Sequence, residues 1–371
     1  MKDYSNISDE DLLALKHKTE FDIAKYHNFQ LVRKIQLNSA YGSIGNQYFR
    51  YYSLELAEAV TLSGQLIIQY IAHQINVFLN DSVGTKNTDY VIASDTDSVY
   101  LNMECIVNKF GKNRTKQETV DYINNVCNKI INPFIEKQFL KLSTTMNAYE
   151  NKISMEREVI ADKGIWTAKK RYMLNVWDSE GIRYNEPKQK IMGIETSRSS
   201  TPEIVRKKLK ECISMILNKE ESDIIKFIAE FKEEFFSLDP DKIAFPRSVN
   251  GIKKYTDKDQ IYKKGTPIAV KGALLHNHYL KKMNLSKKYN KISEGEKIKF
   301  IYLKKPNPIA GFKGDDCVIA FSNKLPKEFA LEGFIDYNTQ FEKTFLDPLV
   351  IILNVIGWNH EETNTLESLF I

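Results

Sequence analysis

The sequence contains few cysteines and no long apolar run. Its four cysteines stand far apart and form no C-x-x-C pair: Cys105, Cys127, Cys212 and Cys317. Such spacing supports neither a zinc site nor a disulfide framework, so we expect ordinary buried thiols in a reducing cytosol. No apolar run approaches the ~18 residues of a membrane span, and none follows Met1-Lys2-Asp3-Tyr4. Secretion and membrane insertion are therefore not expected.

The 371 residues are 42% hydrophobic and 27% charged, which allows a substantial core. At about 100–200 residues per domain, two or three domains or subdomains are expected. The net charge of +5 hides an uneven distribution: residues 163–210 carry a net +7, residues 251–300 a net +9, and residues 301–371 a net −4. Two basic blocks suggest a surface for a polyanion, although solvated lysine faces would explain them equally well.

Local signals predict several elements in the first half of the chain. Ser8 and Asp11 resemble a capping box that begins a helix over 8–45, and a second helix is predicted over 53–80. β-Branched and aromatic residues on both sides of a polar tetrad predict a hairpin over 89–103 with its turn at Asp95–Ser98. Further predictions are a helix over 117–146, strands around 152–160 and 170–178, and a mostly helical remainder from about residue 200.

The tetrad Asp95-Thr96-Asp97-Ser98 is the sharpest chemical feature. Two carboxylates this close repel each other unless a cation neutralises them. Mg²⁺ suits such hard oxygen donors, because it is commonly held by one or two carboxylates together with substrate phosphates. The alternative is an Asx-type turn in which the side chains bond local backbone amides.

A second polar group lies on the first predicted helix. Lys34, Asn38 and Tyr41 stand at i, i+4 and i+7 and therefore share one face. Lys34 can bind a phosphate, Asn38 can donate and accept hydrogen bonds, and Tyr41 offers a flat ring for a base pair. Gly42 follows without a side chain, which allows a large ligand to approach closely. A solvated Lys/Asn stripe beside a buried Tyr is the alternative.

These segments resemble ordered motifs of family B DNA polymerases. Lys34-Ile-Gln-Leu-Asn38-Ser39-Ala-Tyr41-Gly42 matches that family's K-x-x-x-N-S-x-Y-G motif, and Asp95-Thr96-Asp97-Ser98 matches its D-T-D-S hairpin. Lys169-Lys170-Arg171-Tyr172 is similar to its K-K-R-Y segment. Other stretches, including 45–52, 172–177 and 190–202, resemble the replicative polymerases of T-even-type bacteriophages. The likeness covers most of the chain and thins after about residue 240.

The resemblance implies roles for individual residues. Asp97 would coordinate Mg²⁺ directly with Asp95 adjacent, and Glu158 would lie near the metals. Nucleotide-binding residues would be Lys34, Asn38, Tyr41, Gly42 and Thr96. The residues implied for primer-template DNA are Lys169, Lys170, Arg171, Tyr172 and Lys190. A two-metal phosphoryl transfer is consistent with this set, because it needs carboxylates for the metals and cations for the triphosphate.

Departures from the family pattern concern the second metal ligand. The family's other metal-binding aspartate stands in a D-x-x-S-L-Y-P-S motif, which is absent from this sequence, as are the first fingers helix and the exonuclease domain. Ala93-Ser94 also replaces the common Tyr-Gly before the D-T-D. We therefore expect no polymerisation by this chain alone. It is either the C-terminal chain of a split polymerase, completed by an N-terminal chain, or a remnant that only binds duplex DNA or RNA.

The resemblance predicts an α+β architecture in three parts: the C-terminal part of the fingers over 1–45, a palm with an antiparallel sheet over 46–193, and a mostly helical thumb over 194–371. The implied reaction is template-directed addition of a dNTP to a primer, in the cytoplasm of a bacterial host. The resemblance also implies a sliding-clamp peptide at the C-terminal Leu369 and Phe370; docking of these side chains onto the thumb is the alternative.

Overall fold

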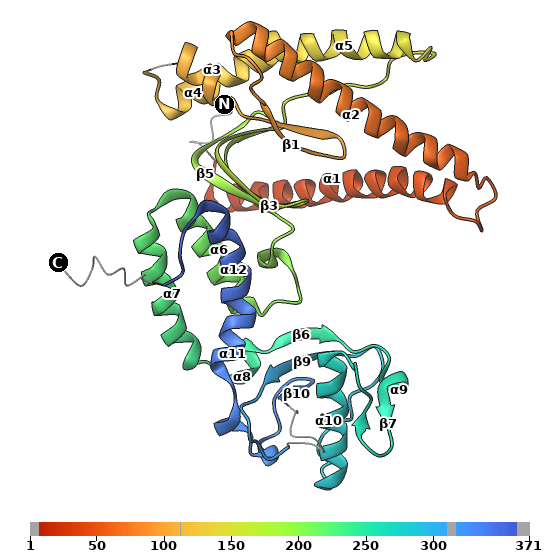
Figure 1. Ribbon diagram of the computed structural model, residues 1–371, viewed down its shortest axis with the longest axis vertical. Helices are drawn as coiled ribbons and strands as arrows, with labels where there is room; N and C mark the ends of the chain where they lie inside the picture. The colour runs from red at the N-terminus through yellow and green to blue at the C-terminus, as the bar shows by residue number, and fades with distance from the viewer. Residues whose placement is uncertain (1–6, 112, 310–316, 362–371) are drawn as a thin grey trace, which may run out of the picture. The chain divides into compact units, whose positions relative to one another are not determined.

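A computed structural model describes residues 7–111, 113–309 and 317–361 of the chain (Figure 1). Contacts between residues divide the chain into two compact units, unit 1 (Met1–Glu156) and unit 2 (Arg157–Ile371). Small antiparallel sheets and many helices confirm the predicted α+β class. The predicted division into fingers, palm and thumb stays a prediction.

Unit 1 begins with two long helices, as predicted. Helix α1 (Asp9–Ile44) starts at Ser8, whose side chain accepts a hydrogen bond from the Asp11 amide, and acidic residues in its first turn favour the positive end of the helix dipole. Helix α2 (Leu54–Val83) starts at Ser53 and ends at Gly84, which has a left-handed conformation. The two helices differ in packing: α1 contributes no buried residue, whereas α2 buries one stripe. That stripe consists of Ala57, Ile71, Ile75, Leu79 and Val83.

The predicted hairpin is confirmed as β1 (Val91–Asp95) and β2 (Ser98–Leu101). A short helix that the sequence analysis missed, α3 (Glu104–Phe110), follows it. α2 also packs against α5 (Asn132–Thr145), where the rings of Phe78 and Phe134 stack with centroids 4.1 Å apart.

The predicted single helix over 117–146 is wrong in one respect, because a π-helical turn interrupts it. The segment consists of α4 (Lys116–Val126), the π turn η1 (Cys127–Ile131) and α5. Pro133 at the second position of α5 has no amide hydrogen to donate to the preceding turn, and the wider turn accommodates this. The same arrangement recurs in unit 2, where the π turn η5 (Glu342–Leu346) precedes Pro348 of α12 (Asp347–Ile356).

Unit 2 begins with a three-stranded antiparallel sheet. Its strands are β3 (Val159–Ala168), β4 (Arg171–Ser179) and β5 (Ile182–Met192), and β4 lies in the middle. The strand predicted at 170–178 is confirmed. The strand predicted at 152–160 is wrong, since β3 begins only at Val159, and β5 was not predicted.

Helices form the main core of unit 2. Phe231, Phe235, Phe341 and Phe345 pack their rings against one another there. The helical segments are η2 (Glu195–Ser197), α6 (Glu203–Asn218), α7 (Glu221–Phe236), α8 (Pro240–Ile243), α11 (Tyr337–Phe341), η5 and α12.

The mostly helical remainder predicted from residue 200 is interrupted by a second sheet in unit 2. Its strand order is β10 (Val318–Phe321), β9 (Lys297–Tyr302) and β6 (Phe245–Ser248), and helix α10 (Ile268–Lys282) packs on it. Gly272 permits this packing, because a Cβ atom there would lie 3.0 Å from the Ala320 amide nitrogen. Smaller elements complete the unit: α9 (Ile252–Tyr255), β7 (Thr256–Asp257), β8 (Ile261–Tyr262), η3 (Lys327–Phe329) and η4 (Glu332–Phe334).

The cysteines correct one expectation. Cys127 and Cys212 are buried as expected, whereas Cys105 is exposed and Cys317 is half-buried. Burial raises the pKa of the Cys212 thiol to about 12. Within the described part of the chain, no helix combines the length and apolar character that a bilayer span requires.

Candidate active site

The β1–β2 hairpin presents the acidic tetrad at its tip (Figure 1). Asp95 pairs with Ser98 across the strands, so that Thr96 and Asp97 form the turn. Thr96 has φ 55°, a left-handed conformation that is rare and costly for a β-branched residue. The Asp97 amide donates to the Asp95 carbonyl at 2.7 Å, and the Ser98 hydroxyl donates to the same oxygen at 3.1 Å. Local hydrogen bonds thus hold a strained tip, which is typical of functional turns.

The two carboxylates at this tip have different surroundings. The half-buried Asp95 accepts a hydrogen bond from the Thr96 hydroxyl at 3.0 Å on Oδ1. Asp97 is exposed, and within the described residues no hydrogen bond or ion pair engages its carboxylate. The Asx-turn alternative is therefore not met at Asp97, whose side-chain oxygens remain open to a cation.

The donor set at the tip fits Mg²⁺ in kind, since both aspartates offer hard oxygens. Among the residues that the structure describes, no group of three or more His, Cys, Asp or Glu side chains could hold a metal ion. For Mg²⁺ to bind at this tip, oxygens beyond those of Asp95 and Asp97 would have to complete the coordination.

The second predicted group lies on the last turns of α1. Lys34, Asn38, Tyr41 and Gly42 are all exposed. A Cβ atom on Gly42 would meet no atom within 4 Å, so the space beside this glycine is open. The alternative of a solvated Lys/Asn stripe beside a buried Tyr is therefore met only in part, because Tyr41 is not buried.

Helix α2 connects the two groups. At its beginning, the Ser53 amide donates to the Ile44 carbonyl at 3.0 Å, and Gly45 lies against Ala57. Near its other end, Asn76 bonds the backbone that enters β1. Helix α2 therefore contacts both the C-terminal end of α1, which follows the Lys34–Gly42 group, and the start of the hairpin.

In unit 2, Lys169 and Lys170 form the tight turn between β3 and β4, and both are exposed. Lys170 has φ 62°. Arg171, the first residue of β4, forms an ion pair with Glu195 at 2.8 Å. Tyr172 is 7% exposed and stacks on Trp166, so it contributes to the packing of the sheet. The sequence analysis did not identify Glu195 as a partner of the basic segment.

Glu158 and Lys190 lie together in unit 2. The Lys190 Nζ atom is 2.6 Å from Glu158 Oε1, with side chains 31% and 57% exposed. Glu158 was predicted to lie near the metals and Lys190 to bind DNA, and their contact with each other was not predicted.

A buried ion-pair cluster lies near them. Asp178 is 1% exposed and accepts from Arg157, from Arg183 Nε at 3.0 Å and from the Gly181 amide at 3.1 Å. It stabilises the β4–β5 turn, and Asp178-x-x-Gly181 is the turn signal that identifies it.

The predicted clamp residues Leu369 and Phe370 lie outside the described residues.

Comparisons with known proteins complete the description. Residues 11–354 match the model of DNA polymerase family B. The chain is 36% identical to the DNA-directed DNA polymerase of Enterobacteria phage T4 over its whole length, which is 42% of that relative. It is 37% identical to the corresponding protein of Escherichia phage RB69 over 92% of the chain and 38% of the relative. A 25% identity to the DNA polymerase delta catalytic subunit of Drosophila melanogaster covers 52% of the chain. The chain thus spans about two fifths of the length of the two phage relatives.

Proposed function

The chain belongs to DNA polymerase family B, and from this premise we propose that it supplies part of the active site of a template-directed DNA polymerase. The reaction is attack of a primer 3′-hydroxyl on the α-phosphate of a dNTP, which releases pyrophosphate. The observation that carries the proposal is the strained hairpin tip, which presents the exposed Asp97 carboxylate next to the half-buried Asp95.

Asp97 would hold Mg²⁺ directly, and Asp95 would lie beside it. When bound, two such ions stabilise the attacking and leaving oxygens. On α1, Lys34 would bind the triphosphate, with Asn38 beside it, while Tyr41 and Gly42 line the nascent base pair. Thr96 orients the Asp95 carboxylate through its hydroxyl and borders the nucleotide.

Unit 2 would bind the primer-template duplex. Lys169 and Lys170 are exposed in a tight turn, and Lys190 lies on a strand of the same sheet. Residues 163–210 and 251–300 carry net charges of +7 and +9, which favours a polyanion. Arg171 and Tyr172 would support this surface from within the sheet, because both have partners there.

We propose further that a separate N-terminal polypeptide completes the site with the second metal aspartate and carries the exonuclease. Helix α1 supports this, since it spans 36 residues without a buried one. Its exposed apolar side chains include Phe21, Ile23, Phe29 and Leu37. They stand on several sides of the helix among charged residues, and so many exposed large apolar side chains on one helix are typical of an interaction surface.

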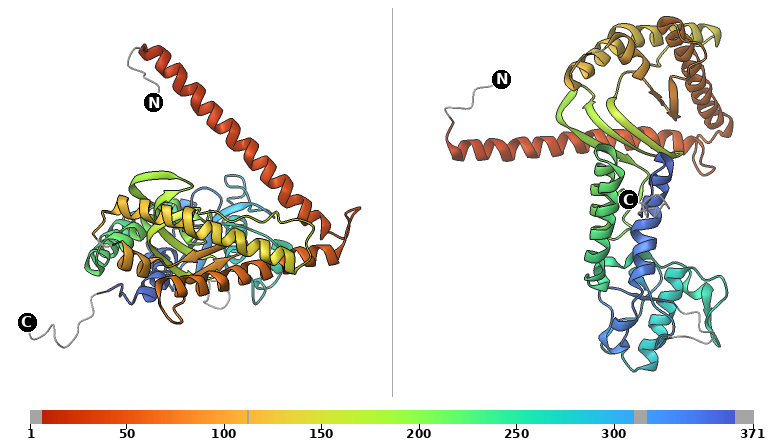
Figure 2. Two further views of the ribbon diagram at one scale, coloured as in Figure 1. Left: turned by 90° about the horizontal axis from the view of Figure 1, so that it is seen from above. Right: turned by 60° about the vertical axis from the view of Figure 1, so that its left-hand side comes forward.

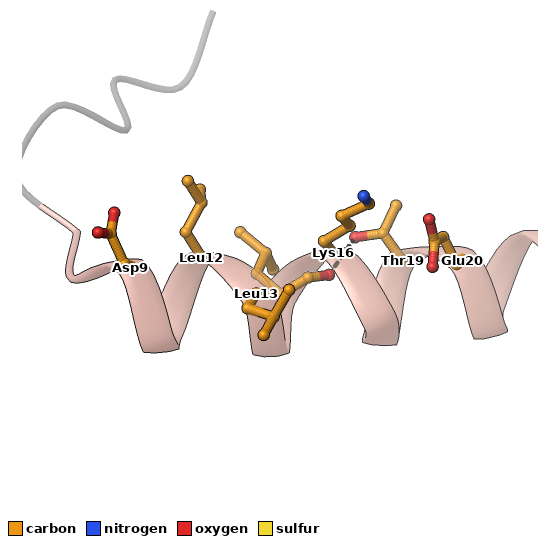
Figure 3. A pocket seen from close by; sticks show the side chains of 7 residues that line it. Asp9, Leu12, Leu13, Lys16, Thr19 and Glu20 are labelled. Atoms are coloured by element: carbon orange, nitrogen blue, oxygen red, sulfur yellow. Dashed lines mark hydrogen bonds between the residues drawn. The ribbon is translucent and has the colours of Figure 1, made fainter.

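Figure 3 shows the N-terminal part of this helix. Leu12 and Leu13 line a shallow hollow together with Asp9, Lys16, Thr19 and Glu20. All of these residues come from one helix, so the hollow is an uncovered helix surface rather than an enclosed ligand site. A helix of the partner would pack antiparallel to α1 here.

A sliding clamp would bind through Leu369 and Phe370, and the complex would act in the cytoplasm of a bacterial host cell.

The test is primer extension with Mg²⁺ and dNTPs, by the chain alone and with an N-terminal family B polypeptide that carries the D-x-x-S-L-Y-P-S motif. We expect extension only with the partner. Asp97→Asn should abolish extension but leave duplex affinity and its salt dependence unchanged, whereas Asp81→Asn, an exposed aspartate on α2, should change neither. Duplex binding without extension by the complete mixture would instead identify a binding remnant. Extension by the chain alone would refute the requirement for a partner.

A further inference from the structure

Two asparagines of α2 bind the segment that leads into the catalytic hairpin. Asn76 and Asn80 stand one helical turn apart in the second half of this helix, and both are half-buried. Asparagine is a poor helix former, because its side chain competes for backbone hydrogen bonds. Here both side chains bond the connection between α2 and β1, which we call the 84–90 connection.

Asn76 holds the last residue of the connection and the first residue of β1. Its Oδ1 atom accepts from the Tyr90 amide at 2.9 Å and from the Val91 amide at 3.0 Å. Two N–H donors fix this atom as oxygen and leave the nitrogen on the other side. That nitrogen donates to Asp89 Oδ1 at 2.7 Å.

Asn80 makes four hydrogen bonds, three of which hold the middle of the connection. Its Nδ2 atom donates to the carbonyls of Asn76 and Thr88, both at 2.8 Å. Its Oδ1 atom accepts from the Thr88 amide at 3.0 Å and from the Thr85 hydroxyl at 2.9 Å. All four bonding positions of the amide are filled, so Asn80 fixes the connection on which Asn76 acts.

The connection is also fixed from its own side. Tyr90 is 1% exposed, and its hydroxyl lies 2.9 Å from that of Thr85. The Tyr90 carbonyl accepts from the Asn102 amide, just beyond the end of β2, at 2.8 Å. Both strands of the hairpin are thus tied at the base to Tyr90, which Asn76 ties to α2.

The bonds that Asn76 makes at the base of the hairpin affect the position of the carboxylates at its tip. Among the strands that the structure describes, β1 pairs with β2 and with no other, and a two-stranded hairpin has little stability of its own in water. Asp95 lies four residues beyond Val91, about 13 Å along the strand. A change of angle at the base is therefore carried to the tip.

We propose that Asn76, supported by Asn80, is a positioning residue that sets where the Asp95–Asp97 tip lies relative to α2. Because α1 also packs against α2, Asn76 sets the position of the Asp95 and Asp97 carboxylates relative to α1. The inference rests on the proposed function for its catalytic consequence. Its structural part concerns this chain alone.

The test exchanges donor and acceptor between Asn76 and Asp89. Asn76→Asp keeps the acceptor for Tyr90 and Val91 but removes the donor to Asp89 and creates a like-charge contact. Asp89→Asn alone retains an acceptor for Asn76 and should remain near wild type. The double variant N76D/D89N restores the bond with its direction reversed and should recover the wild-type behaviour. Val77→Ala, an exposed neighbour on α2, is the control.

Two readouts decide the result. In the assembled polymerase, N76D and Asn76→Ala should lower kcat about 10²-fold, the usual effect of a ~1 Å misplacement, with duplex affinity and the KM for dNTP within about twofold. In the purified full chain, amide exchange over residues 91–101 should accelerate about tenfold in both variants and return to normal in N76D/D89N.

A wild-type kcat in N76A, or a double variant as impaired as N76D, would overturn the inference. Should N76A fail to fold, the comparison of N76D with N76D/D89N still decides it. If the wild-type assembly extends no primer, the proposed function fails. The rate of amide exchange then tests the positioning role of Asn76 independently, and an unchanged rate in N76A overturns the inference.

Discussion

A Cβ atom on Gly193 would lie 2.1 Å from the carbonyl oxygen of Lys170. Gly193 follows β5, whereas Lys170 stands in the turn between β3 and β4. The close approach leaves no room for any other residue, and Gly193 also has φ 68°. The glycine therefore fixes the position of the lysine turn that we propose binds DNA.

Gly193→Ala should displace this turn and weaken duplex binding, with a loss of about 1–2 from the slope of log affinity against log salt. Gly181→Ala is the matched control, since Gly181 has φ 86° but open space around its Cβ position. Each variant should lose about 1–2 kcal/mol of unfolding free energy from the left-handed conformation alone. Fluorescence anisotropy at several salt concentrations measures the binding. Equal DNA affinity in the two variants would contradict the proposed role of the turn.

The Glu158–Lys190 ion pair predicts opposite effects of its two members on DNA binding. Lys190→Ala should lower duplex affinity and reduce the salt slope by about 0.9, the share of one phosphate contact. Glu158→Gln should raise the affinity, because it frees the Lys190 ammonium from a competing carboxylate 2.6 Å away. Stability should hardly change, since exposed pairs contribute little.

Asp347→Asn provides the control for this pair. It breaks a similar ion pair with Lys343, at 2.9 Å and with side chains 48% and 45% exposed, outside both basic blocks. Duplex affinity should stay unchanged. If the two amide variants raise the affinity equally, net charge alone explains the effect and Lys190 has no specific role.

The exposed apolar side chains of α1 predict a variant that impairs assembly but not folding. Phe21 is 68% exposed, so Phe21→Asp should leave the thermal unfolding of the chain unchanged. It should weaken binding of the N-terminal polypeptide, because a buried charge without a partner is costly at an interface. Val355→Asp, at a 50% exposed aliphatic position on α12, is the control. Sedimentation velocity of the mixture measures assembly; wild-type binding by the Phe21 variant would contradict the docking of a partner on α1.

Unit 1 could be predicted closely because its signals are local. Ser8 and Ser53 cap helices through their own side chains, and Gly84 ends α2 in the left-handed conformation that glycine favours. The tetrad between two apolar stretches likewise indicated the hairpin. The acidic tip itself was thus predictable as a structure, and its chemistry followed from the family motif.

Unit 2 was less predictable because long-range contacts determine its elements. β5 contains Pro187 among polar residues and forms a strand only through its pairing with β4, where Lys190 lies opposite Leu174. Lys169 and Lys170 are not turn-forming residues, and the room for their turn is provided by Gly193. A polar residue in a helix, such as Asn76, is predicted to be solvated as long as the chain segment that it binds is unknown.

His276 predicts how stability depends on pH. It lies on α10 at 3% exposure, with its ring against Phe329, and its Nδ1 has no hydrogen-bond partner among the described residues. Burial lowers the pKa of His276 to about 4, against the opposing effect of backbone hydrogen bonds with Asn290 and Ala320.

The unfolded chain therefore binds a proton near pH 6.5 that the folded chain does not accept until about pH 4. Stability from this group is complete above pH 6.5 and falls with pH across that window, by about 1.4 kcal/mol per unit and on the order of 3 kcal/mol in total. Urea unfolding at pH 7 and pH 5 measures the change. His276→Gln should show about 2 kcal/mol less loss between these pH values than wild type. His73→Gln, at an exposed position on α2, should retain the wild-type loss. An equal pH dependence in wild type and His276→Gln would mean that carboxylates, rather than His276, determine acid stability.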